Sequence, residues 1–151
     1  MKGGDEVAGV AEVAGWNQRF SCGDELPEVI KEEITHTQLV KYAGASGDFN
    51  PVHTVTQEGE KAGFGGVIAH GMLIMGYAGQ AIGMWFPRKN LRRFKVRFAA
   101  VTRPGEQITL NGRVLEEITV GDEKRLLCAV TASNSQGEIK LKGEFEIGGE
   151  E

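Results

Sequence analysis

An uncharged, glycine-rich segment at residues 64–87 constrains the fold of this chain more than any other feature. It contains no Asp, Glu, Lys or Arg. A continuous helix that starts at Gly71 and stops before Pro87 is short for a bilayer, which needs about 20 residues. Glycine weakens helices, so something that wraps closely around this helix must offset the cost. We therefore predict a helix from Gly71 to about Phe86 that is buried on all sides in a soluble domain.

After Pro87 the hydrophobic pattern changes to a period of two. Apolar and polar residues alternate in four runs, at residues 94–100, 108–114, 126–132 and 139–147. Each run predicts an antiparallel strand with one buried and one solvent-exposed face. In the last run, the residues predicted to be exposed are Lys140, Lys142, Glu144 and Glu146. Glycines at 105, 121 and 137 mark the turns. A one-sided sheet and an apolar helix must cover each other, which predicts the α+β class.

The chain before the central helix predicts shorter elements. Residues 28–34 can form a first strand. Thr35 then begins a helix that runs to about Ala45, and Gln38 completes a Thr-x-x-Gln capping box. Residues 56–62 predict a short second helix, which ends at the glycines that follow.

The length of 151 residues is typical of one domain. We expect a single domain over residues 23–151. Residues 1–22 lack a clear hydrophobic period and predict a loose N-terminal arm, from which Trp16 and Phe20 would pack onto the domain.

The composition excludes several classes of protein. The formal net charge of −4 argues against general affinity for nucleic acid, which needs a basic surface. Two cysteines, Cys22 and Cys128, are too few for a disulfide framework, and Cys128 lies in an apolar strand pattern that predicts burial. Residues 1–15 show no basic start followed by an apolar core, so we expect no secretory signal. We expect a cytoplasmic protein that does not enter a membrane.

Residues 42–53, YAGASGDFNPVH, carry the strongest chemical signal. They place Asp48 and His53 five positions apart around an Asn-Pro turn. Ile-Ala-His-Gly-Met at residues 68–72 then opens the central helix. A carboxylate and an imidazole that face a helix N-terminus suit the transfer of protons and water beside a polarised carbonyl. Alone, an Asp-x-Asn-Pro segment is more often only a turn, so the functional interpretation depends on the three features together.

These motifs resemble the MaoC-like, or (R)-specific enoyl-thioester hydratase, family. The family's loop pattern, Tyr/Phe-Ala, two residues, then Ser-Gly-Asp-x-Asn-Pro-x-His, matches residues 42–53 without a gap. Its second element, Ala-Gly-Phe and then Ile-Ala-His-Gly-Met, matches residues 62–64 and 68–72. The resemblance covers about residues 23–147 and, within the family, is to the catalytic B subunit of actinobacterial 3-hydroxyacyl-carrier-protein dehydratases. It implies the hot-dog fold, an antiparallel sheet wrapped around a long central helix.

The resemblance also implies roles for individual residues. The family interconverts trans-2-enoyl and (3R)-3-hydroxyacyl thioesters of coenzyme A or acyl carrier protein, without a cofactor. We expect Asp48 to act as the base towards water and His53 to relay the proton to Cα, although a coupled pair need not divide these roles cleanly. The backbone N–H of Gly71 would stabilise the thioester oxyanion. Ser46 and Asn50 would shape the loop.

Candidate substrate-binding residues flank this machinery. Methionines in such a helix are more often core, but Met72 and Met75 lie close enough to its start to line an acyl tunnel. Residues 88–97 hold the chain's only basic cluster. Most of it fits the solvated face of a strand, whereas Arg93 and Arg97 are candidates to bind the phosphates of coenzyme A or an acidic carrier protein. Nucleic acid is a weaker alternative, because no aromatic residues for base stacking share that face.

We expect no metal site. His36 falls in the first turn of a helix and is predicted to be exposed, and His70 is predicted to cap or pack at the start of the central helix. No close pair of ligands is expected among His36, His53 and His70.

Two alternatives stay open. Hot-dog thioesterases usually carry their carboxylate on the central helix, and residues 71–86 contain none. An acyl-binding or stabilising subunit of a heterodimer is the other alternative, although the Asp48 and His53 pair argues against a purely passive role. We expect a homodimer, or a heterodimer with another hot-dog subunit, because pairing the sheet edges would cover otherwise exposed strands.

Overall fold

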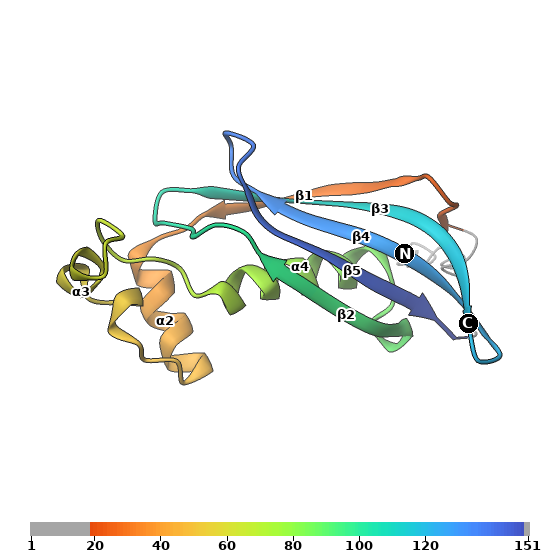
Figure 1. Ribbon diagram of the computed structural model, residues 1–151, viewed down its shortest axis with the longest axis horizontal. Coiled ribbons are helices and arrows are strands. Elements are labelled where there is room, and N and C mark those ends of the chain that lie inside the picture. Colours follow the sequence, from red (N-terminus) through yellow and green to blue (C-terminus); the bar gives the residue numbers. More distant parts are fainter. Residues whose placement is uncertain (1–18, 150–151) are drawn as a thin grey trace, which may run out of the picture.

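The computed structural model describes residues 19–149 and contains one antiparallel sheet in that range (Figure 1). Its strands are β1 (Glu25–Glu33), β2 (Leu91–Phe98), β3 (Gln107–Val120), β4 (Glu123–Ser133) and β5 (Ile139–Gly148). Their order across the sheet is β1-β3-β4-β5-β2. β1 and β2 are therefore the edge strands, and the four strands predicted after Pro87 are confirmed.

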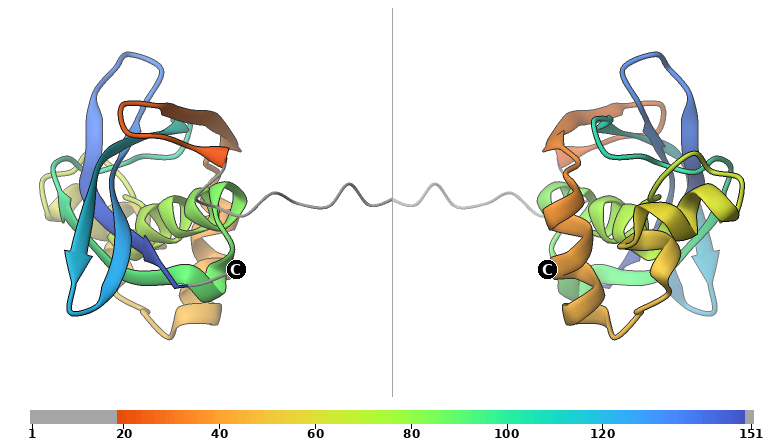
Figure 2. Two further views of the ribbon diagram at one scale, coloured as in Figure 1. Left: turned by 90° about the vertical axis from the view of Figure 1, so that its right-hand side faces the viewer. Right: turned by 90° about the vertical axis from the view of Figure 1, so that its left-hand side faces the viewer.

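The helices lie on one side of the sheet and beyond one end of it. They are α2 (His36–Ser46), α3 (Thr56–Lys61) and α4 (Gly71–Trp85), with short 3-10 turns η1 (Pro51–His53) and η2 (Arg88–Asn90). Figure 2 shows the sheet curving around α4, and Figure 1 shows α2 and α3 beyond the sheet at the end where α4 begins. The helix from Gly71 is confirmed, and it ends at Trp85 where Pro87 cannot continue it.

The hydrophobic core lies between α4 and the concave face of the sheet. Seven residues of α4 are buried there: Leu73, Ile74, Tyr77, Ala78, Ala81, Ile82 and Trp85. Small side chains on α4 let the helix lie close to the strands, and Gly112 of β3 leaves room for the ring of Trp85. A Cβ atom at Gly112 of β3 would lie 2.7 Å from the ring of Trp85, which explains a glycine in mid-strand.

The prediction that α4 is buried on all sides is wrong. Met72 is 56% exposed and Met84 is 66% exposed, and Gly76 and Gln80 lie on the same open face. A single sheet reaches only one side of the helix, so the opposite side is left exposed among residues 19–149. Close packing of the sheet against α4 also does not explain every glycine of this helix, because a Cβ at Gly76 would meet nothing within 4 Å.

The period-two pattern predicts burial well in β4 but not throughout β5. Cys128 is fully buried, as predicted. In β5, Lys140 is 1% exposed and Glu146 is 7% exposed, although both were predicted to face solvent. Residues 99–106 cross over Lys140, while Glu146 sits beside Arg125 of β4, with Nη1 to Oε2 at 3.9 Å. Neighbouring segments, rather than the pattern of β5 itself, bury these two charges.

The N-terminal elements follow the prediction with two corrections. β1 begins at Glu25, three residues earlier than expected, because it pairs along β3. The hydroxyl of Thr35 accepts the N–H of Gln38 at 3.1 Å, which confirms the N-terminal cap of α2. The amide of Gln38 instead bonds the hydroxyl of Tyr77, so the capping box is only half formed.

Phe20 packs edge-on against Phe86 with ring centroids 5.3 Å apart, as expected. Trp16 and most of the predicted N-terminal arm lie outside the described residues. Over residues 19–149, none of the helices has the length and apolarity needed to cross a membrane.

Candidate active site

A short loop between α2 and η1 presents Asp48. α2 ends at Ser46 and is capped by Gly47, whose φ of 76° lies in the left-handed region that favours glycine. The hydroxyl of Ser46 then accepts the N–H of Asp48 at 3.1 Å, and the side chain of Asn50 accepts the N–H of Val52 at 3.2 Å. Oδ1 of Asp48 accepts the N–H of Asn50 at 3.2 Å. These short-range bonds hold the loop and leave Oδ2 of Asp48 free to face the next element.

The ring of His53, on η1, faces the carboxylate of Asp48. Nδ1 of His53 lies 2.8 Å from the carbonyl of Ile68. A carbonyl only accepts, so Nδ1 carries the hydrogen and Nε2 of the neutral ring has a lone pair. That Nε2 lies 3.8 Å from Oδ2 of Asp48, with side-chain exposures of 11% and 53%. Two acceptors at this distance make no direct hydrogen bond, and one water molecule can donate to both.

The start of α4 lies beside this pair. Gly71 is the first residue of α4, so its N–H has no partner within the helix and points out of the positive end of the helix dipole. The ring of Phe98, at the end of β2, lies 3.3 Å from the position of a Cβ at Gly71. Phe98 is 48% exposed. No pattern in the sequence points to Phe98, because the contact between β2 and the helix start arises only in the fold.

His70 connects the loop, η1 and the start of α4. It occupies the N-cap position of α4, but its side chain makes no capping hydrogen bond, so the predicted side-chain cap is absent and the predicted packing is present. Its Nε2 lies 3.1 Å from the backbone carbonyl of Asp48. Its ring stacks on His53 at 3.8 Å between centroids and meets Tyr42 edge-on at 4.8 Å. These contacts bring His53 and His70 together, far closer than the sequence suggested.

His36 is exposed, as predicted, and its Nε2 lies 2.8 Å from the carbonyl of Thr54. The geometry of the other two histidines corrects one expectation. One ligand atom each from Asp48, His53 and His70 lies within 4.8 Å of the others, so a close pair does exist. The two rings are stacked with planes 23° apart. Nitrogen lone pairs in nearly parallel rings do not converge on one ion at about 2 Å, so the cluster is poorly shaped for zinc.

The predicted acyl-binding methionines lie at the start of α4 but differ in exposure. Met72 is exposed on the open face of α4, so the expectation of a core position is wrong for it and for Met84. Met75 is half-buried and Tyr77 is buried. Met72 follows Gly71 directly, and Met75 lies one turn further along the helix.

The predicted basic residues lie on the edge strand β2 and differ in their cross-strand neighbours. Arg93 is opposite Glu146 of β5, whereas Arg97 is opposite Lys142. Opposite charges across a strand pair attract, and like charges repel. Arg97 and Lys142 therefore form a pair of like charges, and Arg97 directly precedes Phe98 in β2.

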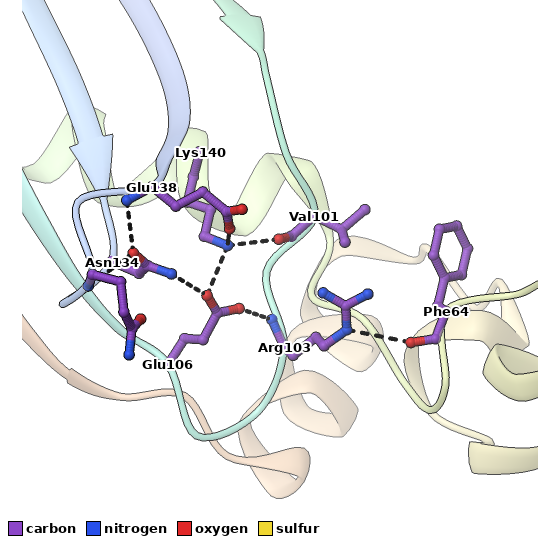
Figure 3. A network of polar contacts seen from close by, with 8 residues as sticks. Phe64, Val101, Arg103, Glu106, Asn134, Glu138 and Lys140 are labelled. Atoms are coloured by element: carbon purple, nitrogen blue, oxygen red, sulfur yellow. Dashed lines mark hydrogen bonds and ion pairs between the residues drawn. The ribbon is translucent and has the colours of Figure 1, made fainter.

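A polar network surrounds the buried ammonium group of Lys140 (Figure 3). Nζ of Lys140 donates to the carbonyl of Val101 at 2.8 Å and pairs with Glu106 at 2.7 Å. The next carbonyl along the chain, that of Thr102, accepts the N–H of Ala69 at 2.7 Å. Ala69 directly precedes His70, so the network anchors the segment that leads into α4. The sequence pattern concealed this network because it assigned Lys140 to the solvent-exposed face.

Comparison with known proteins shows the family. Residues 5–135 match the model of the MaoC like domain. The chain is 29% identical over 121 residues to a 3-hydroxybutyryl-CoA dehydratase of Methylorubrum extorquens, a match that covers 79% of this chain and 75% of that protein.

Solved structures show the same fold. The unliganded (R)-hydratase PhaJ1 of Pseudomonas aeruginosa is 27% identical and superposes with a TM-score of 0.76, over 88% of this chain and 83% of that one. A HadBC (3R)-hydroxyacyl-ACP dehydratase complex of Mycobacterium tuberculosis, 11% identical, has a TM-score of 0.65 over 85% of this chain and 96% of that one. The predicted hot-dog fold and family resemblance are confirmed: the chain belongs to the MaoC-like hydratase and dehydratase family.

Proposed function

We propose that this chain is an (R)-specific hydratase and dehydratase that interconverts trans-2-enoyl and (3R)-3-hydroxyacyl thioesters. One observation carries the proposal: Nε2 of His53 and Oδ2 of Asp48 face each other 3.8 Å apart, beside the N-terminus of α4. The similarity to a CoA-thioester dehydratase and to an (R)-hydratase supports the chemistry and its stereochemistry. The free thiols of Cys22 and Cys128 suit a reducing, cytoplasmic setting.

The geometry suits addition of water across a double bond. A water held between Asp48 and His53 loses a proton to the pair, with Asp48 as the base, and its oxygen bonds to Cβ of the enoyl group. The electron pair of the double bond moves towards the thioester oxygen, where the N–H of Gly71 stabilises the negative charge. The proton passes from the carboxyl of Asp48 to the lone pair on Nε2 of His53, which delivers it to Cα, so both groups return to their starting state. Dehydration is the reverse.

The alternative of a thioesterase lacks support, because α4 carries no carboxylate. We further propose that Met72 and Met75 contact the acyl chain. Arg97, which faces Lys142 rather than a glutamate, is the better of the two arginine candidates for the phosphates of coenzyme A or of a carrier protein's pantetheine arm.

We also propose that the chain works as a dimer, with itself or with another hot-dog subunit. β1 and β2 are sheet edges, and within residues 19–149 the face of α4 that bears Met72 and Met84 is exposed. Solved relatives with this fold include heteromeric complexes. Light scattering of the purified protein tests this proposal, and a stable monomer would contradict it.

The deciding experiment measures hydration of a short trans-2-enoyl-CoA by loss of the conjugated thioester absorbance. Asp48→Asn should lower kcat by about 10²- to 10⁴-fold, as expected for loss of one general acid-base group. Glu117→Gln, the same chemical change at an exposed carboxylate on β3, is the matched control and should leave kcat unchanged. The product should be oxidised by an (R)-specific 3-hydroxyacyl dehydrogenase. Equal turnover by wild type and Asp48→Asn would contradict the proposal.

A further inference from the structure

His70 touches all three parts of the proposed machinery. Its Nε2 lies 3.1 Å from the carbonyl of Asp48, and its ring stacks on that of His53 at 3.8 Å. Its own backbone leads directly into Gly71, the first residue of α4. Its side chain is also almost completely buried, with 1% exposed. One imidazole therefore lies between the acid-base pair and the helix start.

The hydrogen bonding assigns the tautomer of His70. A backbone carbonyl only accepts, so Nε2 donates and carries the hydrogen of the neutral ring. Nδ1 then carries the lone pair, and it is buried with no hydrogen-bond partner among residues 19–149. Protonation of Nδ1 would create a buried N–H with no acceptor in that range, which is costly.

The groups around His70 act on its charge in opposite directions. Burial lowers the pKa of His70 most strongly, and the imidazole of His53 lowers it further. The carbonyl and carboxylate of Asp48 raise the pKa but do not outweigh these effects. Tyr42, the other ring that packs on His70, contacts it edge-on. The ring is therefore neutral near pH 7, and neither of its nitrogens is placed to exchange protons with substrate.

We infer that His70 is a positioning residue for the reaction proposed above: its Nε2–H holds the backbone of Asp48, and its ring braces His53. Both catalytic groups are thereby aligned with the N–H of Gly71. This inference rests on the proposed function. It assigns to the histidine of the helix-start motif a task distinct from capping and from proton transfer.

Two variants separate the hydrogen bond from the ring contact. His70→Phe keeps a flat ring against His53 but removes the donor to Asp48. His70→Gln keeps an N–H donor at a similar distance from the backbone. His70→Phe should lower kcat by about 10- to 100-fold, because misplacement of reacting groups by about 1 Å has effects of that size. KM should change by less than about threefold, because substrate contacts remain.

His70→Gln should keep a kcat closer to that of wild type than His70→Phe does. This split between kcat and KM, with rescue by the variant that restores the donor, is not expected of a residue that only fills space. Two results would overturn the inference: a folded His70→Phe enzyme within twofold of wild-type kcat, or a His70→Gln enzyme impaired as strongly as His70→Phe.

A measurement on the wild-type protein tests the geometry without relying on activity. ¹⁵N chemical shifts of the His70 ring should report a neutral Nε2–H tautomer at about pH 7.5, above the ordinary histidine pKa of about 6.5. An Nδ1–H tautomer would contradict the inference even if the variants failed to fold. Full turnover by Asp48→Asn would instead defeat the proposed function, while the ¹⁵N shifts would still decide whether His70 holds Asp48.

Discussion

The ammonium group of Lys140 lies 2.7 Å from Oε1 of Glu106, although the side chain of Lys140 is only 1% exposed. The same ammonium pairs with Glu138 and donates to the carbonyl of Val101, so all three of its hydrogens have acceptors. These bonds tie β5 to the chain crossing at residues 99–106. The ion pair therefore helps to hold residues 99–106 in place, and the carbonyl of Thr102 in that segment accepts the N–H of Ala69, just before the proposed active site.

Replacing Lys140 by methionine should destabilise the protein strongly. The variant leaves Glu106 without its cation in a largely buried place, and breaking such a pair costs about 3 kcal/mol. Urea unfolding of Lys140→Met measures the change in the free energy of unfolding. Lys142→Met, two residues along β5 and exposed, is the control and should shift that free energy by less than about 0.5 kcal/mol. Equal stability of the two variants would show that the buried pair contributes nothing.

The Glu106 carboxyl should make stability fall in acid. Burial raises its pKa, but hydrogen bonds from Lys140, Asn134 and the N–H of Arg103, with the charge of Lys140, together hold the pKa below its usual value. A carboxyl with a lowered folded-state pKa stabilises the fold above its unfolded pKa of about 4.3 and loses that effect as the pH falls through the folded value.

The difference in unfolding free energy between wild type and Glu106→Gln should therefore be constant from about pH 7 to pH 5 and shrink below about pH 4. Urea unfolding at several pH values checks this. A difference that stays constant down to about pH 3 would show that protonation of Glu106 is not coupled to folding.

Two glycines should respond in opposite ways to alanine. A Cβ at Gly59 of α3 would overlap the carbonyl oxygen of Gly66, whereas a Cβ at Gly44 of α2 would meet nothing within 4 Å. Gly59→Ala should lower the midpoint of thermal unfolding, with a cost of about 1–3 kcal/mol for overpacking. Gly44→Ala should raise it, since alanine is favoured in a helix by up to about 1 kcal/mol. A stabilised Gly59→Ala protein would mean that α3 moves away from Gly66 at little cost.

Arg97 should matter more than Arg93 for binding of the thioester's carrier. Arg97 faces Lys142, and Arg93 faces Glu146. Arg97→Ala should raise KM for an enoyl-CoA several-fold at low ionic strength with kcat little changed, and added salt should reduce the difference from wild type. Arg93→Ala is the matched control, with a smaller expected effect. Steady-state kinetics at two salt concentrations test this, and equal KM values for both variants would remove the basis for preferring Arg97.

Local patterns in the sequence were sufficient to predict most of the fold. The uncharged run before Pro87 predicted α4 to within a residue, and the period-two runs predicted β2 to β5. The cap at Thr35 and the loop around Asp48 depend on residues two to five positions apart. Such short-range contacts follow from backbone geometry and turn chemistry, so they can be predicted without knowing the rest of the chain.

The tertiary structure alone decided the remaining features. His53 and His70 stack because η1 folds back onto the start of α4, and Lys140 is buried because residues 99–106 pass over it. Phe98 reaches Gly71 from the end of an edge strand. Each of these contacts joins residues more than 15 positions apart, so no local period signals them. The sequence determined which groups the protein has for chemistry, and the packing of distant segments decided which of them are held together and which are shielded from water.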